Sequence, residues 1–195
     1  MRLSLVHASV FAATLLSASL AHASTITFSG APFGPGFTGP VTEAGFTYSL
    51  ASGSLYINTD GNPGNNVEPN LGAGTGGTLR IVSATAGLFD FAGIDVGSAG
   101  SGSISVSGYD GATLVGTDSF AGANTGLPGT YTRYTSGNLD DLTSLLISLP
   151  ASPETAIDNV VVNSVAAATP EPSTLALFGT GILGLAGMAR RRFLA

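Results

Sequence analysis

The stretch SISVSGYDGATLV, residues 103–115, decides the fold. In its first half, serines alternate with Ile104 and Val106, which is the period-two pattern of a strand with one solvated face. The pair Asp110-Gly111 then suits the positive φ angles of a two-residue type I′ turn, and a second β-favouring run follows it. The stretch therefore predicts a β-hairpin.

Similar short segments extend from this hairpin in both directions. Between residues 24 and 165, β-favouring runs are separated by Gly, Asn, Asp, Pro and Ser, and no window has a helical period. We expect ten strands, at residues 25–29, 45–50, 54–58, 78–83, 89–96, 101–109, 112–120, 130–135, 142–149 and 156–165. Short strands without helices predict an all-β fold, namely a single β-sandwich of jelly-roll type.

Two later segments indicate where the core lies. Leu145, Ile147 and Leu149 recur with period two, so we expect them to face the core. The last segment, AIDNVVVNSV at residues 156–165, has polar and apolar residues on both of its faces. Its two ends are therefore expected in different environments.

The region after residue 23 lacks most of the usual catalytic side chains. The 195-residue chain has no Cys and no Lys, and its two histidines are His7 and His22. Between residues 24 and 195 this excludes a Ser-His-Asp triad, a Cys nucleophile, a Schiff-base lysine and a His or Cys zinc site. Carboxylates, hydroxyl groups and the backbone remain.

Residues 24–169 are strongly acidic. They contain two basic residues, Arg80 and Arg133, and eleven of the twelve acids, so 2 minus 11 gives a net charge of −9. Nucleic-acid binding depends on clustered Lys and Arg, so nucleic acid is not an expected partner. Neutral sugars and divalent cations are compatible with this charge.

Residues 1–23 have the order of a secretory signal peptide. One arginine precedes an apolar run over residues 3–20, and Ala21 and Ala23 then place small side chains where a signal peptidase reads them. Cleavage after Ala23 would make Ser24 the first mature residue. The alternative is a buried N-terminal helix or a membrane anchor.

A second apolar run lies near the C-terminus. Residues 174–189 carry no charge and are followed by Arg190, Arg191 and Arg192. This pattern predicts a transmembrane helix over 174–189, although that length is short for a hydrocarbon core of ~30 Å. The arginines are expected to hold their end in the cytoplasm, which places an exported body on the opposite side of the membrane. A plain tail anchor is the alternative.

The motif Pro170-Glu171-Pro172 stands just before this run. A Pro-Glu-Pro motif, an apolar span and a terminal basic cluster together resemble the PEP-CTERM sorting signal of Gram-negative bacteria, also catalogued as an ice-binding protein C-terminal domain. The resemblance implies that a membrane exosortase cuts near residues 170–172. The body would then be released or transferred from the inner membrane to the cell envelope, the cell surface or an exopolysaccharide matrix.

These features predict three parts: a signal peptide at residues 1–23, a β-sandwich at 24–166 and a sorting signal at 167–195. Signal peptidase and exosortase are the expected partners during export, and the C-terminal helix would contact the membrane before processing.

The predicted body also resembles the β-sandwich bodies common among PEP-CTERM proteins. The resemblance rests on FDFAGID at residues 89–95, on the hairpin after it, and on IDNV at 157–160. Similar jelly rolls serve as carbohydrate-binding modules, often with one structural calcium ion. Extracellular polysaccharide is therefore an expected ligand class.

Oxygen-rich side chains suggest where calcium could bind. Asp60, Asn62 and Asn66 lie in a Gly-rich segment and offer the oxygen ligands that calcium prefers, although the EF-hand glutamate is missing. Asp158 is a separate candidate by resemblance to sandwich domains that bind calcium beside the last strand. The alternatives are a plain surface loop and a strand-end cap. We expect no cofactor to be required, and a structural calcium ion is the one candidate.

Four tyrosines could stack against sugar rings: Tyr56, Tyr109, Tyr131 and Tyr134. Aromatic rings bury large flat areas and keep one polar end. The alternative is that these side chains cover the edges of the sandwich or the hairpin.

Catalysis would require paired carboxylates, as in glycosidases. Asp140 and Asp141 are adjacent and would point to opposite faces of a strand, whereas a pair such as Asp90 with Asp118 is left open by the sequence.

Ice binding would require a flat, regular threonine array, and Thr130, Thr132 and Thr135 are too few and too irregular for one. The sequence therefore predicts a non-catalytic envelope or matrix protein with a structural or adhesive role, associated with exopolysaccharide. A carbohydrate-active enzyme and an ice-binding adhesin are the alternatives.

Overall fold

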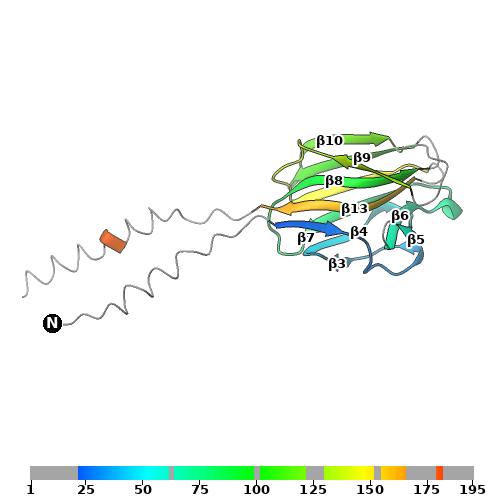
Figure 1. Cartoon of the computed structure of the whole chain (residues 1–195), viewed down its shortest axis with the longest axis horizontal. Helices are drawn as coiled ribbons and strands as arrows, with labels where there is room; N and C mark the ends of the chain where they lie inside the picture. Colours follow the sequence, from blue (N-terminus) through cyan, green and yellow to red (C-terminus); the bar gives the residue numbers. More distant parts are fainter. Residues whose placement is uncertain are drawn as a thin grey trace, which may run out of the picture. The chain divides into compact units, whose positions relative to one another are not determined.

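A computed structural model describes residues 22–61, 64–98, 102–121, 130–151, 155–165 and 179–181. Residues Ala21–Val165 form one compact unit, which consists of two antiparallel sheets and a core shared between them (Figure 1). The predicted all-β sandwich of jelly-roll type is confirmed.

Sheet A has the strand order β11-β8-β13-β6-β5-β2, and β1 pairs with β13 beside this path. Its strands are β1 (His22–Ile26), β2 (Gly34–Phe37), β5 (Leu55–Gly61), β6 (Gly64–Pro69), β8 (Phe89–Ser98), β11 (Tyr131–Thr135) and β13 (Thr155–Ser164). Apart from β5 and β6, which follow each other directly, neighbours in this sheet come from distant parts of the sequence, so its outer face collects residues that no local pattern connects.

Sheet B has the order β10-β9-β12-β7-β4-β3. Its strands are β3 (Val41–Glu43), β4 (Phe46–Gly53), β7 (Gly77–Ser83), β9 (Ser103–Asp110), β10 (Thr113–Ala121) and β12 (Ser144–Leu149), and a short 3-10 helix, η1 (Leu71–Ala73), precedes β7. Leu145, Ile147 and Leu149 of β12 are buried, as predicted.

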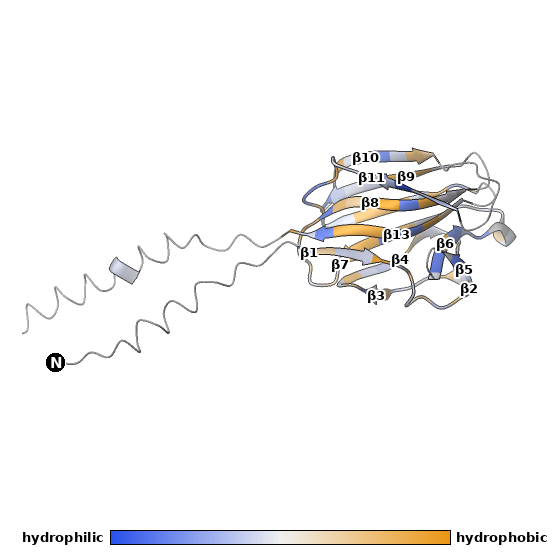
Figure 2. Ribbon diagram, viewed as in Figure 1, coloured by the Kyte–Doolittle hydropathy of each residue, from blue (hydrophilic) through white to orange (hydrophobic). Residues whose placement is uncertain are grey.

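The core is built from the inward side chains of both sheets. Figure 2 shows hydrophobic residues concentrated along β8 and β13 in the middle of the unit. Aromatic pairs join the layers: Phe46 of β4 meets Phe89 of β8 edge-on, with ring centroids 5.2 Å apart. Each fully buried large apolar side chain contributes about 1.5–3 kcal/mol, so alternate positions on many strands stabilise the sandwich together.

The predicted hairpin is present, but its turn differs from the prediction. Asp110 pairs with Thr113, so the two-residue loop is Gly111-Ala112 rather than Asp110-Gly111. Gly111 has φ +59°, and Ala112 is not among the described residues with positive φ. Glycine at the first loop position with a single positive φ fits type II′, so the prediction of a type I′ turn is wrong.

A bulge explains the ambiguous last strand. On β13 the register shifts between Asp158, which pairs with Asp95, and Val161, which pairs with Gly93. Asn159 has φ +46° at this point. The register shifts again between Val161 and Val162, which pairs with Phe91, and these irregularities reverse the alternation of inward and outward side chains on β13. Ile157, Val160 and Val162 therefore all reach the core.

Strands β2, β3 and β6 were not expected from the sequence. The segment around Asp60, interpreted as a loop, is instead a hairpin in which Asn58 of β5 pairs with Asn66 of β6. Its tip at residues 62–63, with Asn62, lies outside the described residues.

Most of the predicted processing signals lie outside the described residues, including Ala21, Pro170, Glu171, Pro172 and arginines 190–192. Within the predicted transmembrane helix only residues 179–181 are described, and they are helical. Among the described residues, no helix is both long and apolar enough for a membrane span. Ala23 and Ser24 lie within β1, so cleavage after Ala23 would keep the part of this strand that begins at Ser24.

Candidate functional site

The outer face of sheet A brings together aromatic and charged side chains that are far apart in the sequence. Because alternate residues of a strand share one face, the pairing register identifies them. Across the sheet, Arg133 pairs with Asp95, Asp95 with Asp158, Asn66 with Asn58, and Glu68 with Tyr56. These residues, with Tyr131 beside Gly97, form the outer face.

Tyr131 lies across this face rather than standing upright on it. A Cβ atom placed on Gly97 of β8 would lie only 3.0 Å from Cε1 and 3.2 Å from Cδ1 of the Tyr131 ring. The ring therefore covers Gly97, and it can do so because that residue has no side chain. From β11 the phenol reaches β6, where its oxygen lies 2.6 Å from Nδ2 of Asn66.

Asn66 is the centre of a polar cluster. Its Nδ2 donates to Oδ1 of Asp60 at 2.9 Å and to Oε1 of Glu68 at 3.0 Å, in addition to Tyr131. The residue is 1% exposed, and its Oδ1 has no hydrogen-bond partner among the described residues. Buried polar atoms in proteins are normally paired, so this oxygen is an exception that requires an explanation.

The negative charge around Tyr131 is substantial. Burial raises the pKa of the Tyr131 phenol, the hydrogen bond with Asn66 lowers it, and the charges of Asp158, Asp60 and Glu68 raise it further. Asp158 itself is 0% exposed, and its Oδ1 accepts the backbone N–H of Asn159 at 2.7 Å. The phenol is therefore protonated near neutral pH.

Arg133 is held at the edge of this face. Its guanidinium lies 3.0 Å from Oδ1 of Asp95 and donates to the backbone carbonyl of Asn159 at 2.9 Å. The other carboxylate oxygen of Asp95 accepts from Nδ2 of Asn159 at 2.9 Å. The guanidinium of Arg133 is thus already bound to the carboxylate of Asp95 and to the backbone of the β13 bulge.

An aromatic pair lies beside this cluster and consists of Tyr56 on β5 and Phe33, which immediately precedes β2. The rings of Tyr56 and Phe33 meet edge-on, with centroids 5.7 Å apart and planes at 88°. Phe33 is 61% exposed, which is unusual for a large apolar side chain. Asn65 donates to the carbonyls of Phe28 and Ala31, both at 3.2 Å, and so fixes the segment that leads to Phe33.

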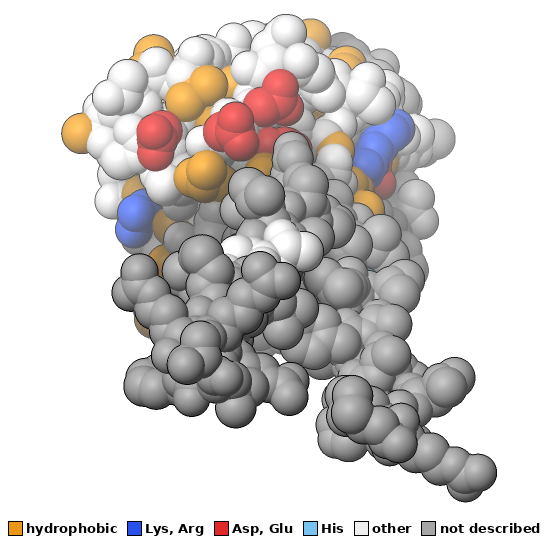
Figure 3. Space-filling model, turned by 90° about the vertical axis from the view of Figure 1, so that its left-hand side faces the viewer, with side chains coloured by type: hydrophobic (Ala, Val, Ile, Leu, Met, Phe, Trp, Pro, Cys, Tyr) orange, Lys and Arg blue, Asp and Glu red, His pale blue; other side chains and the backbone are white. Residues whose placement is uncertain are grey.

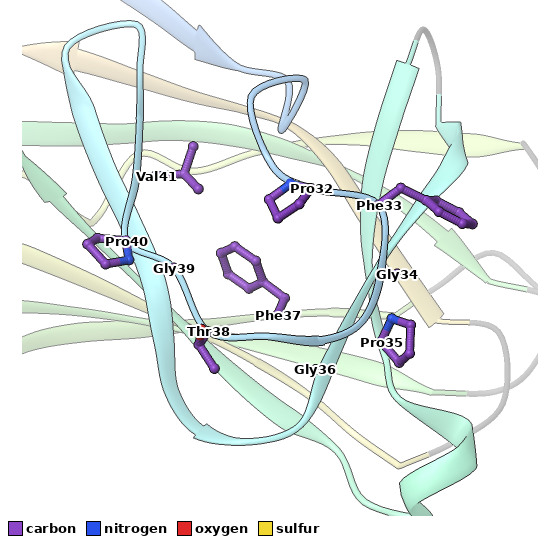
Figure 4. Close-up of a pocket in the computed structure, with 10 residues that line it drawn as sticks. All are labelled: Pro32, Phe33, Gly34, Pro35, Gly36, Phe37, Thr38, Gly39, Pro40 and Val41. Carbon is purple, nitrogen blue, oxygen red and sulfur yellow. The ribbon is translucent and has the colours of Figure 1, made fainter.

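A cavity of about 400 Å³ lies within the same segment, residues 32–41. Figure 4 shows Pro32, Phe37 and Val41 directed into the loop and Phe33 directed away from it. The lining is apolar apart from Thr38 and the backbone, so this cavity offers little chemistry of its own.

The four predicted platform tyrosines do not form one group. Tyr56 and Tyr131 share the outer face of sheet A. Tyr109 lies on β9 of sheet B, opposite Ser144. Tyr134 packs against the core, with its ring 5.1 Å from that of Phe120, and its hydroxyl donates to the carbonyl of Ala121.

The predicted calcium ligands come together in part. Asp60, Asn66 and Asp158 lie around Tyr131, whereas Asn62 is outside the described residues. Within the described ranges, no group of three or more His, Cys, Asp or Glu residues is placed to hold a metal ion. Calcium binding stays a prediction. Sequence reasoning missed Glu68, although its alternation with Asn66 in NNVEP could have suggested it.

Other surfaces have a different character. On sheet B the register aligns one row of hydroxyl side chains across five strands, formed by Ser52, Thr78, Ser148, Ser105 and Ser119. Figure 3 shows acidic side chains side by side at one end of the unit, with arginine side chains on both flanks. Of the carboxylates considered for catalysis, Asp90 accepts the backbone N–H of Asp141 at 2.9 Å, while Asp118 accepts from Ser136.

Comparison with known proteins identifies the tail. Residues 168–192 match the PEP-CTERM protein-sorting motif, which confirms the predicted sorting signal. This motif marks the chain for export and for membrane-anchored sorting to the cell envelope by an exosortase. No curated protein matches the sequence.

Two solved structures that contain carbohydrate-binding modules are similar to this chain. One is a family 11 carbohydrate-binding module from Clostridium thermocellum in complex with a β-1,3-1,4-mixed-linked tetrasaccharide (14% identity, 71% of this chain, 100% of that chain, TM-score 0.33). The other comprises the CBM22-1-GH10 modules of a C. thermocellum endo-1,4-β-D-xylanase complexed with xylohexaose (13% identity, 71% of this chain, 30% of that chain, TM-score 0.34).

Proposed function

We propose that this exported, exosortase-sorted protein is non-catalytic and binds extracellular polysaccharide on the outer face of sheet A. One observation carries the proposal. The Tyr131 ring lies flat over Gly97 in the interior of that face and is held there by Asn66, 65 residues away in the sequence.

A ring in this position suits a sugar. Pyranose rings present C–H groups on their faces, which pack against flat aromatic side chains, and a tyrosine adds a hydroxyl at the ring's end. The Tyr131 ring is restrained by Gly97 below it and by Asn66 at its hydroxyl. A platform already ordered in the free protein loses little conformational entropy on binding.

Polar groups surround the platform at the spacing of neighbouring strands. Asn58, Glu68 and Tyr56 lie on one side of it, and Arg133 lies on the other. Sugar-binding sites combine apolar contact with a few fixed polar groups that set orientation. The partly exposed Tyr56 and Phe33 pair extends the same face, which fits a chain of several sugar units better than a single sugar.

Affinity electrophoresis tests this proposal. The full-length chain in detergent is run through gels that contain soluble polysaccharides, with Tyr131→Ala and its matched control Tyr109→Ala on sheet B. We expect at least one polysaccharide to retard the native chain and Tyr109→Ala equally, and to retard Tyr131→Ala about tenfold less, as for loss of a stacking contact of about 1–2 kcal/mol. Equal retardation of both variants would contradict the proposed site.

The same experiment examines catalysis. Bound polysaccharide is recovered and its chain length and reducing ends are measured after prolonged incubation. Unchanged length supports a binding protein, and new reducing ends would show an enzyme that uses paired carboxylates.

A further inference from the structure

Hydrogen-bond acceptors gather beside the Tyr131 platform. Asp60, Glu68 and Tyr131 all place an oxygen within 2.6–3.0 Å of Nδ2 of Asn66. That nitrogen carries two hydrogens; the protonated hydroxyl of Tyr131 and Nδ2 of Asn58, 3.4 Å from Oε1 of Glu68, are further donors here. We name these four residues, Asp60, Asn66, Glu68 and Tyr131, the acceptor cluster.

Asn66 adds an acceptor that is not served at all. Its side chain is 1% exposed and points into the cluster, and its Oδ1 has no partner among the described residues. An unpaired buried acceptor is unfavourable because it has lost its contact with water without gaining a partner. Oδ1 of Asn66 therefore lacks a donor, and a ligand that brings only acceptors would not supply one.

The charge of the same region is equally one-sided. Within the described residues, the Lys and Arg side chains are Arg80 on sheet B and Arg133 on sheet A. Arg133 is bound to Asp95 and to the β13 bulge. The charges of Asp158, Asp60 and Glu68 all act on Tyr131. A positively charged ligand group would meet carboxylates there, next to the aromatic ring.

We propose that the polysaccharide bound on the outer face of sheet A carries free amino groups, one of which binds as an ammonium ion at the acceptor cluster. This inference rests on the glycan-binding function proposed above. An ammonium group brings three donors and no acceptor, and its hydrogen bonds to carboxylates are charge-assisted. The neighbouring sugar ring then stacks on Tyr131, whose face also attracts a cation.

Other ligand groups fit the cluster less well. A neutral sugar hydroxyl brings one donor together with two acceptor lone pairs, and a uronic acid brings further acceptors and a repelled negative charge. Calcium takes six to eight oxygen ligands. No group of three acidic or His residues in the described ranges is placed to hold a metal. An ammonium ion needs no such closed coordination shell.

Calorimetric titration of the full-length chain in detergent tests the inference. Three β-1,4-linked oligomers of equal length are compared: glucosamine, N-acetylglucosamine and glucose, each with and without EDTA. We expect the glucosamine oligomer to bind about tenfold more tightly than the other two, independently of EDTA. Glu68→Gln keeps the shape but removes a charge, and it should reduce this preference to about threefold or less. Asp110→Asn, on the hairpin of sheet B, is the matched control and should leave the preference unchanged.

A poly-lysine titration separates sugar recognition from charge alone. Weaker binding of poly-lysine than of the glucosamine oligomer, with loss of both by about 1 M salt, supports an ammonium-bearing sugar as ligand. Four outcomes would each overturn this inference: equal affinity for the three oligomers, an unchanged preference in Glu68→Gln, loss of binding in EDTA, or equally tight binding of poly-lysine. The glycan-binding function is tested separately, by Tyr131→Ala. Failure of every oligomer and polysaccharide to bind would overturn the proposed function itself.

Discussion

The hydroxyl oxygen of Tyr131 lies 2.6 Å from Nδ2 of Asn66, although the two residues are 65 positions apart. This contact runs from β11 to β6 and passes over β8 and β13, which lie between them in sheet A. It therefore exists only when these four strands have assembled. A single amide both orders the aromatic platform and serves the carboxylates beside it.

Replacement of Asn66 should destabilise the fold. In Asn66→Ala, Asp60, Glu68 and Tyr131 lose their shared donor. A lost buried hydrogen-bond partner costs about 1–3 kcal/mol, so the free energy of unfolding in urea should fall by that amount. Asn58→Ala, on the neighbouring strand of the same face, is the control and should cost less. A smaller effect for Asn66→Ala than for Asn58→Ala would show that Asn66 is not the centre of the cluster.

A side chain at Gly97 should lift the Tyr131 ring. A Cβ there would lie 3.0 Å from Cε1, closer than ordinary van der Waals contact, and the branches of valine would come closer still. We expect Gly97→Val to weaken polysaccharide binding about as much as Tyr131→Ala while far-UV circular dichroism stays native. Gly137→Ala meets nothing within 4 Å and is the matched control. Unchanged binding in Gly97→Val would mean that the flat ring is not the platform.

High pH should unfold the protein. Burial, followed in each case by neighbouring negative charge, raises the pKa of Tyr48 and of Tyr131. In the unfolded chain both phenols ionise near pH 10, and ionisation of the folded chain requires a higher pH. The unfolded state therefore binds fewer protons above about pH 10, and stability falls as pH rises, by up to about 1.4 kcal/mol per pH unit for each phenol. Urea unfolding between pH 8 and about 12 should show this decline, and Tyr131→Phe should reduce its slope by one proton.

Features that depend on contacts between residues close in the sequence could be predicted, whereas those that depend on distant residues could not. The hairpin at residues 103–115 and the core positions Leu145, Ile147 and Leu149 follow from local alternation, and they are present. The turn was shifted by one residue, because Asp110 and Gly111 suit several turn registers equally and the strand pairing decides among them.

The missed elements have identifiable causes. Strands β2 and β3 are at sheet edges. Strand β2 consists of Gly and Pro with one Phe, a composition that is typical of a turn. The bulge at Asn159 reverses the alternation within β13, so no single period describes that strand. The platform depends on the order of strands in sheet A. Tyr131 and Asn66 could be singled out as residue types, but their contact could not be predicted.

Strain at Gly111 provides a local test of the hairpin. Its φ of +59° is accessible to glycine and costs other residues about 1–2 kcal/mol. We expect Gly111→Val to lower the free energy of unfolding by about that amount, and Ala112→Val, at the neighbouring loop position, to cost less. If the two variants were equally stable, the backbone of Gly111 would not be left-handed in solution.

The final prediction concerns processing of the tail, and it rests on the match of residues 168–192 to the sorting motif. We expect the envelope form of the protein to begin at Ser24 and to end near residues 170–172, as measured by intact mass. Replacement of Pro170, Glu171 and Pro172 by alanine removes the motif but keeps the apolar run and arginines 190–192. This variant should stay in the membrane fraction at full C-terminal length, since an apolar run with a basic end is still held by the bilayer. Pro150→Ala, within the body, should be processed normally. A native envelope form that still contained residues 173–195 would show that the motif acts here as an anchor and not as a cleavage signal.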